Sequence, residues 1–248
     1  MASNNAYGPQ VVTDGLVLCL DANNAKSYPG AGATWYDLSG KGNHATINNA
    51  VFDTSEKGFL LDGTNDWMTC TTFDNVSMPM NGISVFVGCK SADFTRGSNY
   101  ERFYLFDTRY SGSSSTGVGV CFDASSAGYT TPMHFVNDAA GYDEAAGPDG
   151  FAEDTFYIVG LSRISGATSM KILTTDSKTL VTPTLTGSGN TLGTGGFSPG
   201  GYSIGTYYPL SNSYTFMGHI YFVWVYNRAL SQKECVQNYN ALRSRFGL

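Results

Sequence analysis

Residues 34–53, TWYDLSGKGNHATINNAVFD, gather side-chain types that can do chemistry. His44 lies seven residues after Asp37, and an imidazole beside a carboxylate can act as a base or a metal ligand. No second His or Cys, however, lies within the short spacing that is typical of metal-ligand pairs. Gly40 and Gly42 permit positive φ, and an Asp side chain caps turn amides well. We therefore predict a structural turn that contains Asp37, Gly40 and Gly42 and positions the next strand. His44 is expected where that strand begins, as an edge imidazole that is neither ligand nor catalyst.

A second oxygen-rich stretch, LDGTNDW, could hold calcium through Asp62, Asn65 and Asp66. The spacing is not that of an EF-hand, because its sixth position is Trp67 and no glutamate follows at the twelfth. We favour a turn that is capped by its own side chains, with Asp62 and Gly63 as structural residues. Calcium at this turn remains the alternative, and no cofactor is required.

The carboxylates of the chain offer little support for catalysis. Six of them fall in a loop-like segment, where they could chelate a cation or keep the loop solvated: Asp138, Asp143, Glu144, Asp149, Glu153 and Asp154. Glucanases of the sandwich class carry two acids on one strand as Glu-x-Asp-x-Glu, and that pattern is absent from the sequence. Gly-x-Ser-x-Gly and His-Glu-x-x-His are also absent. We expect a protein without enzymatic activity, and a degenerate glycoside hydrolase ranks as the last alternative.

Aromatic side chains are the best candidates for binding a ligand. Tyrosine and tryptophan rings stack on sugar faces while neighbouring polar groups bind hydroxyls. Tyr207 and Tyr208 precede a proline in GTYYPLSNSY and are expected in an exposed loop. Trp35 is a third candidate, although a place in the core is the competing interpretation for it. We predict a carbohydrate-binding site at Trp35, Tyr207 and Tyr208.

Composition narrows the possible partners. The 248 residues carry a net charge of −6, and only 14% of them are charged, so neither nucleic acid nor membrane is an expected partner. The N-terminal residues lack the pattern of a signal peptide, and no apolar run reaches the roughly 18 residues of a membrane span. Five cysteines lie inside apolar runs and are expected to be buried free thiols: Cys19, Cys70, Cys89, Cys121 and Cys235.

Periodicity predicts an all-β chain with one helix at its end. About eleven segments have strand length and alternate in hydrophobicity: 15–21, 58–62, 66–72, 82–90, 101–108, 117–123, 132–137, 154–162, 168–176, 201–206 and 215–227. Residues 137–154 and 187–202 are predicted as long loops.

Near the C-terminus, Ser231 and Glu234 form a capping box, followed by an apolar stripe of Val236, Tyr239, Leu242 and Phe246. The expected fold is a two-sheet antiparallel β-sandwich with a short C-terminal α-helix. We expect an N-terminal arm over residues 1–13 and a single domain over residues 14–248.

Four motifs in order resemble the laminin-G-like, concanavalin-A-like lectin and glucanase jelly rolls, and most of all those of bacteriophage virion structural proteins. They are DGLVLCLDANNAKSYPG, TWYDLSGKGNHATI, FLLDGTNDWM and GHIYFVWVYNRALSQKECVQNYNALRSRFGL. The resemblance extends from residue 14 to residue 248 and is weakest between residues 90 and 200. It implies that five residues shape loops: Asp37, Gly40, Asp62, Gly63 and Asp66.

The resemblance also implies a role in a virus particle. It indicates a capsid decoration or tail-associated protein that binds other virion proteins, with host-surface glycans as a further expected ligand. The free thiols and the absence of a signal-peptide pattern predict synthesis in the host cytoplasm before the protein joins the virion. A homo-oligomer is a separate expectation. The alternative is a carbohydrate-binding adhesin on a tail fibre or a cell surface.

Overall fold

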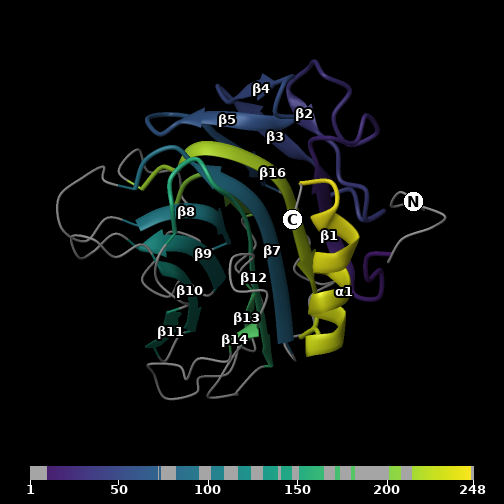
Figure 1. The fold of residues 1–248 in the computed structure, drawn as a ribbon, viewed down its shortest axis with the longest axis vertical. Helices are drawn as coiled ribbons and strands as arrows, with labels where there is room; N and C mark the ends of the chain where they lie inside the picture. Colours follow the sequence, from purple (N-terminus) through teal and green to yellow (C-terminus); the bar gives the residue numbers. More distant parts are fainter. Residues whose placement is uncertain are drawn as a thin grey trace.

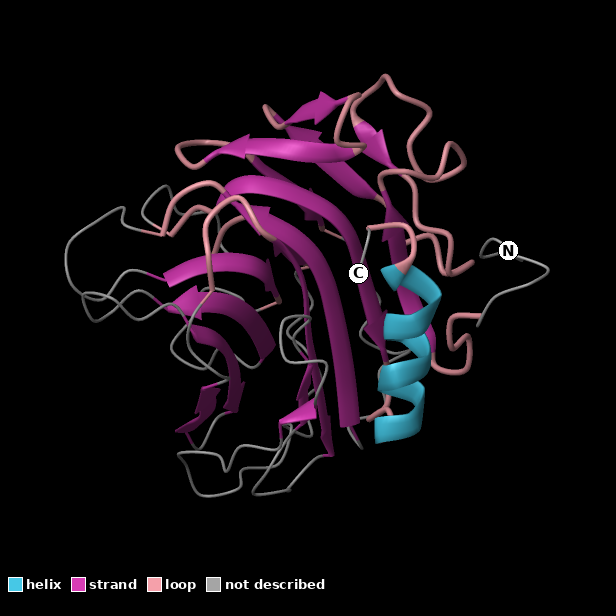
Figure 2. Ribbon diagram, in the orientation of Figure 1, coloured by secondary structure: helices cyan, strands magenta, loops and turns pink. Residues whose placement is uncertain are grey.

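The computed structural model describes residues 10–71, 73, 82–94, 102–108, 117–123, 131–138, 141–146, 151–164, 171–173, 180–181, 201–207 and 214–246. These residues form two antiparallel sheets of eight strands each and one helix, α1 (Gln232–Arg243). Figures 1 and 2 show the sheets curving over one another, with α1 against the outside of one of them. The predicted two-sheet sandwich with a C-terminal helix is therefore confirmed.

Sheet A is built around the long strand β16 (Met217–Tyr226). Its order is β14 (Leu180–Val181), β13 (Lys171–Leu173), β12 (Phe156–Ile164), β7 (Gly82–Ser91), β16, β5 (Gly58–Asp62) and β4 (Val51–Asp53). The first half of β16 pairs with β5, while its second half pairs with β1 (Leu16–Asp21). The two halves of β16 thus pair with different elements, namely β1 and the β4–β5 hairpin that follows it in the sequence.

Sheet B covers the other side of the core. Its order is β11 (Gly141–Ala146), β10 (Thr131–Asp138), β9 (Gly117–Asp123), β8 (Arg102–Asp107), β15 (Tyr202–Ile204), β6 (Trp67–Cys70), β3 (Ala45–Asn48) and β2 (Thr34–Trp35). Each of these strands pairs with neighbours close in the sequence except β15, which inserts between β8 and β6. That insertion brings the late residues 201–207 to the middle of the sheet.

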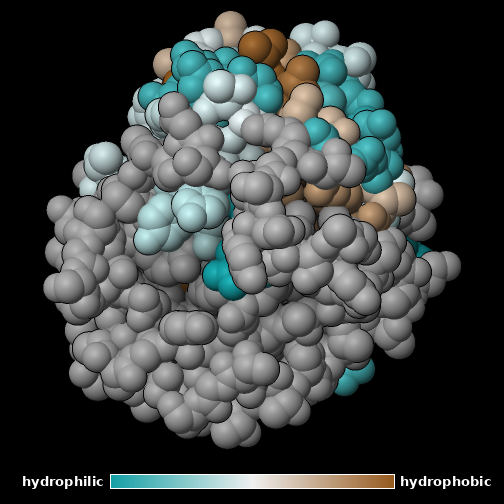
Figure 3. Space-filling view, turned by 90° about the vertical axis from the view of Figure 1, so that its left-hand side faces the viewer, coloured by the Kyte–Doolittle hydropathy of each residue, from teal (hydrophilic) through white to brown (hydrophobic). Residues whose placement is uncertain are grey.

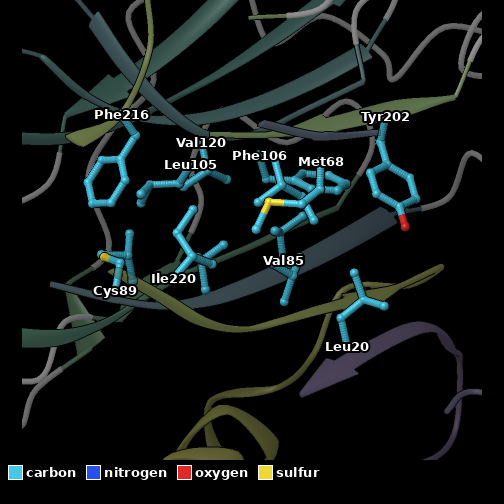
Figure 4. Close-up of a cluster of buried hydrophobic side chains, with 14 of the residues drawn as sticks. Leu20, Met68, Val85, Cys89, Leu105, Phe106, Val120, Tyr202, Phe216 and Ile220 are labelled. Atoms are coloured by element: carbon cyan, nitrogen blue, oxygen red, sulfur yellow. The ribbon is translucent and has the colours of Figure 1, made fainter. Parts of the chain in front are cut away.

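The main core lies between the sheets, where alternate residues of each strand meet. Figure 4 shows Leu105, Phe106 and Met68 from sheet B facing Val85 and Ile220 from sheet A, and all five side chains are fully buried. This interdigitation follows from the period of two along each strand. A bulge between Tyr104 and Phe106 interrupts that period in β8, so that the consecutive residues Leu105 and Phe106 both face the core. All five cysteines are buried free thiols, as the sequence predicts.

A second apolar layer covers the outer face of sheet A beneath α1. Here Gly88 and Gly160 lie opposite Phe222 and Phe86 in the strand register. A Cβ at Gly88 would come within 2.2 Å of the Phe222 ring, and one at Gly160 within 2.5 Å of the Phe86 ring. The glycines therefore make room for aromatic rings to lie flat on the sheet under the helix.

The helix begins at the predicted capping box. The Ser231 hydroxyl accepts a hydrogen bond from the Glu234 amide, and the Glu234 carboxylate accepts one from the Ser231 amide at 2.8 Å. A second partner of Glu234 is Arg228, whose guanidinium lies 2.5 Å from the carboxylate. These hydrogen bonds, that of Arg228 first, lower the pKa of Glu234 to about 2.

The buried stripe of α1 differs from the predicted one. Cys235, Asn238, Tyr239 and Leu242 face the sheet, whereas Val236 is 39% exposed. The prediction was wrong at Val236 because the polar Asn238 interrupts the apolar pattern and so shifts the apparent stripe by one position. Tyr239 and Leu242 are buried as expected.

Residues 10–13, part of the predicted N-terminal arm, lie against this helix. The Asn238 side chain accepts a hydrogen bond from the Val12 amide at 2.9 Å, and the Gln237 side chain donates one to the Gln10 carbonyl at 2.6 Å. The Tyr226 hydroxyl donates to the Val12 carbonyl at 2.9 Å. The segment is thus fixed between α1 and β16.

Each of the eleven predicted strands has a counterpart, and β3 follows His44, where the next strand was expected to begin. Four further strands were missed. Three of these, β2, β4 and β14, have two or three residues, which is too short for alternation to show. The fourth, β11, lies in the segment 137–154 that was predicted as a loop, and this prediction was wrong. Its sequence, GYDEAA, has low β propensity and forms a strand by pairing with β10. Residues 187–200 of the other predicted loop lie outside the described residues.

Among the described residues, no helix has both the length and the apolar character needed to cross a membrane.

We predict that the helix contributes to stability through its buried face. Leu242→Ala should lower the free energy of unfolding by about 2–5 kcal/mol, because Leu242 is 5% exposed. Val236→Ala on the same helix is the matched control and should cost within about 0.5 kcal/mol. Urea denaturation of both variants measures the difference, and equal losses would contradict the observed orientation of α1.

Candidate functional site

The turn around Asp37 is held together by one buried carboxylate. One oxygen of Asp37 accepts hydrogen bonds from the Cys19 amide at 2.8 Å and the Ser39 amide at 2.9 Å. The other oxygen accepts from the Ser39 hydroxyl at 2.7 Å and the Asn43 amide at 3.0 Å. The residue is 7% exposed, so its four partners replace water. Asp37 therefore has a structural place in this turn.

Gly40 and Gly42 give this turn its shape. Their φ angles of +84° and +76° lie in the left-handed region that favours glycine. His44 closes the turn, because its Nδ1 accepts a hydrogen bond from the Asp37 amide at 3.0 Å. The ring proton of the neutral imidazole is thereby assigned to Nε2. His44 is thus an exposed side chain with a structural hydrogen bond, a role that its sequence position alone did not reveal.

The second oxygen-rich turn is also capped by its own side chains. Asp62 accepts hydrogen bonds from the Thr64 amide at 2.7 Å and the Asn65 amide at 3.3 Å. Asp66 is 6% exposed and accepts one from the Asp62 amide at 2.9 Å. Burial raises the pKa of Asp66. Gly63, with φ of +75°, completes the turn, and calcium binding by Asp62, Asn65 and Asp66 stays a prediction.

Trp35 does not reach the surface. Its side chain is fully buried, and its ring lies 4.8 Å from that of Phe59 in the core. The prediction that Trp35 stacks on a sugar was therefore wrong. Strand β2 ends at Trp35, and successive side chains of an extended chain point to opposite faces. Trp35 accordingly points inward, and its neighbour Tyr36 is 43% exposed.

Tyr207 belongs to a cluster of three tyrosines on the outer face of sheet B, which we call the tyrosine cluster: Tyr104, Tyr207 and Tyr214. The ring centroids of Tyr104 and Tyr207 are 5.5 Å apart, those of Tyr207 and Tyr214 are 6.0 Å apart, and those of Tyr104 and Tyr214 are 6.2 Å apart. These spacings are typical of edge-to-face aromatic packing. Tyr208 lies outside the described residues.

Burial changes from one member of the cluster to the next. Tyr104 is 4% exposed and packs on Cys121, Tyr207 is half-buried, and Tyr214 is 37% exposed. The innermost ring thus supports the outer two. The sequence analysis missed Tyr104 and Tyr214. The outward alternation of Tyr104 in RFYLFD was the available signal for the first, because Phe103 and Leu105 on either side point into the core.

The side of the molecule on which β8 and β9 lie in Figure 1 faces the viewer in Figure 3. The described surface there is largely hydrophilic, and the brown, apolar surface gathers toward the top. Polar groups belong to the outer face of sheet B itself: Thr46 on β3, Thr69 on β6 and Arg102 on β8 are at least partly exposed. The outer face of sheet B therefore carries exposed polar side chains as well as the aromatic cluster, and Arg102 lies on the same strand as Tyr104.

A network of charged residues lies on the outer face of sheet A. The Asp53 carboxylate is 3.1 Å from Nε2 of His219, while Glu56 binds Lys90 at 2.6 Å and the Tyr221 hydroxyl at 2.9 Å. Hydrogen bonds from the Ser55 side chain and the turn amides hold the pKa of Asp53 well below its ordinary value. Since these groups bind one another, the network joins the β4–β5 turn to β7 and β16. Among the described residues, no three His, Cys, Asp or Glu side chains are grouped as for a metal ion.

Comparisons with known proteins identify the fold and no family. No protein-family model matches the chain, and no curated protein matches it in sequence. The chain is similar in structure to the sialidase of Trypanosoma rangeli, with a TM-score of 0.61 and 17% identity over 94% of this chain and 33% of that one. It is also similar to the binding domain of botulinum neurotoxin DC, with a TM-score of 0.63 and 11% identity over 93% and 52%.

This chain thus spans about a third of the sialidase and about half of the toxin domain. At such low identity the likeness concerns the fold alone. It is consistent with the lectin-like sandwich that the sequence predicts.

We predict that Asp37 is required for the stability of the sandwich. Asp37→Ala should lower the free energy of unfolding by about 3 kcal/mol or more, because it leaves buried amides of β1 and the turn without an acceptor. Lys41→Ala, at an exposed position of the same turn, should change it by less than about 0.5 kcal/mol. Chemical denaturation checks both, and a small loss for Asp37→Ala would show that water replaces the carboxylate.

Proposed function

We propose that this protein is a non-enzymatic binding protein that recognises carbohydrate through the tyrosine cluster. The observation that carries the proposal is the arrangement of Tyr104, Tyr207 and Tyr214, in which a buried ring supports two rings that reach the surface. A tyrosine offers an apolar face for the C–H groups of a sugar and a hydroxyl for its polar groups. Its two side-chain torsions also cost little entropy when they become fixed on binding.

The position of the cluster supports the same proposal. Residues 201–207 insert into the middle of sheet B through β15, so Tyr207 follows a strand whose three residues are all buried. Tyr104, the buried ring beneath the other two, is itself part of β8. Groups on strands are held more rigidly than groups on loops. This rigid support lowers the entropy that Tyr207 and Tyr214, which lie outside the strands, lose when a sugar binds.

The ligands of the structural neighbours support glycan binding but do not name a ligand for this chain. One Trypanosoma rangeli sialidase structure is in complex with sialic acid, and one structure of the neurotoxin binding domain is in complex with SialylT. Another structure of that domain is in complex with rat synaptotagmin II. These ligands belong to those proteins. Proteins that contain a sandwich of this shape are thus found in complex with sugars and with a protein, and the tyrosine cluster favours a sugar here.

We place this activity on a bacteriophage particle, as a capsid decoration or tail-associated protein that binds other virion proteins. The four motifs that resemble virion jelly rolls support this setting. The described N-terminal residues 10–14 and the helix α1 lie on the outer face of sheet A, opposite the tyrosine cluster. A protein attached through that face would present sheet B to the host. An adhesin on a cell surface would present the same site, so it remains the alternative.

We predict that the protein binds defined glycans on an array and that the cluster is responsible. Tyr214→Ala and Tyr207→Ala should each weaken binding by about tenfold or more, which corresponds to about 1.4 kcal/mol. Tyr36→Ala is the matched control, because this tyrosine is similarly exposed and packs on His44 in another part of the fold. Glycan binding that survives both substitutions would show that the binding site lies outside the tyrosine cluster. Hydrolysis of a bound glycan that is lost in Glu144→Gln would instead show an enzyme.

The virion setting has its own test. Mass spectrometry of purified particles should detect the protein at a copy number comparable to other structural proteins. Its absence from particles, together with glycan binding by the isolated protein, would favour the cell-surface adhesin.

A further inference from the structure

The tyrosine cluster has an ion pair beside it on the same face of the sheet. Arg102 and Tyr104 are two residues apart on β8 and both point away from the core, as do Asp123 and Cys121 on β9. The strand register places Arg102 opposite Asp123 and Tyr104 opposite Cys121. The two cross-strand pairs are therefore roughly 7 Å apart, the rise of two strand residues.

The arginine at this position is balanced by a carboxylate. Nε of Arg102 lies 3.2 Å from an oxygen of Asp123, whose side chain is 6% exposed while that of Arg102 is 32% exposed. A guanidinium that stands beside the aromatic rings is suited to binding hydroxyl groups through its N–H donors. Its charge, however, is offset at close range by the Asp123 carboxylate, and the whole chain carries a net charge of −6.

These charges decide what kind of sugar the site favours. A carboxylated or sulfated sugar gains most from a cation whose charge is not already neutralised, as in arginine clamps for anionic groups. A neutral sugar needs only donors, acceptors and an apolar face. Arg102, which is partly exposed, supplies donors, and the rings and hydroxyls of Tyr207 and Tyr214 supply the apolar face and the acceptors.

We propose that the tyrosine cluster and the Arg102–Asp123 pair form a single site for neutral saccharides, which discriminates against sialylated and other anionic glycans. This inference rests on the proposed function and names its ligand class. It also separates this chain from the structural neighbours that are in complex with sialic acid or SialylT, with which it shares the fold and little of its sequence.

The test compares matched glycans that differ in one charge. The wild-type protein is probed at low salt with a set of neutral oligosaccharides on an array and with the same oligosaccharides capped by sialic acid. Neutral members should bind at least about tenfold more tightly than their capped counterparts. Equal or tighter binding of the capped members would overturn the inference and leave the proposed function intact. If no member binds at all, the proposed function fails with it.

A pair of variants assigns the selectivity to the Arg102–Asp123 pair. Asp123→Asn removes the negative charge beside Arg102 and should reduce the preference for neutral members by about tenfold at low salt, with a smaller effect at high salt. Asp53→Asn makes the same charge change on the outer face of sheet A, where Asp53 pairs with His219, and should leave the preference unchanged. A thermal melt establishes that each variant is folded. An unchanged preference in folded Asp123→Asn would overturn the role of the pair, and the wild-type comparison decides the ligand class even if this variant does not fold.

Discussion

The sandwich depends on the hydrogen bonds that the backbone of β1 makes on the side away from β16. β1 pairs with β16 on one side only, and on the other side the amide of Cys19 donates to the Asp37 carboxylate while its carbonyl accepts from the Leu38 amide. An unsatisfied edge of this kind is costly when buried and prone to pairing with other chains when exposed. The same turn reaches sheet B, because the Tyr202 hydroxyl donates to the Asn43 carbonyl at 2.8 Å. One carboxylate thus closes an edge of sheet A and fixes the turn that joins it to sheet B.

The two outer faces of the sandwich differ in what covers them, and this difference directs where a ligand binds. Beneath α1, sheet A carries an apolar layer, and its glycines let aromatic rings lie flat so that the helix can pack closely over them. Burying that layer stabilises the fold and leaves this part of the sheet inaccessible. Sheet B has no described helix on its outside, and its outward positions combine the tyrosine cluster with threonines and an ion pair. Polar groups beside supported aromatic rings are the features of a site for a hydrated, uncharged ligand.

The sequence predicts those parts of the fold in which local pattern and tertiary packing agree. Long strands with clean alternation and the capping box of α1 were found because the signal lies within a few residues. Short strands such as β2 and β4 were missed because pairing with a neighbour, and not propensity, makes them strands. Trp35 was misplaced because β2 is too short to show which of two adjacent aromatics points inward. The tyrosine cluster was found only in part because its members come from segments about 100 residues apart, which β15 brings together.

Two buried polar side chains show why residue types that suggest chemistry are structural in this chain. Asn238 lies in the apolar face of α1, where it accepts from the Val12 amide and donates to the Tyr226 hydroxyl, which in turn donates to the Val12 carbonyl. Asp37 likewise accepts a hydrogen bond from a backbone amide of β1, as Asn238 does from residues 10–13. Each supplies hydrogen bonds to a backbone segment that lacks a neighbouring strand on that side, and each is buried because the sheet needs it there. Their hydrogen-bonding capacity is used within the fold. Recognition of a ligand therefore falls to side chains that the packing supports but does not enclose, and Tyr207 and Tyr214 meet that condition on the outer face of sheet B.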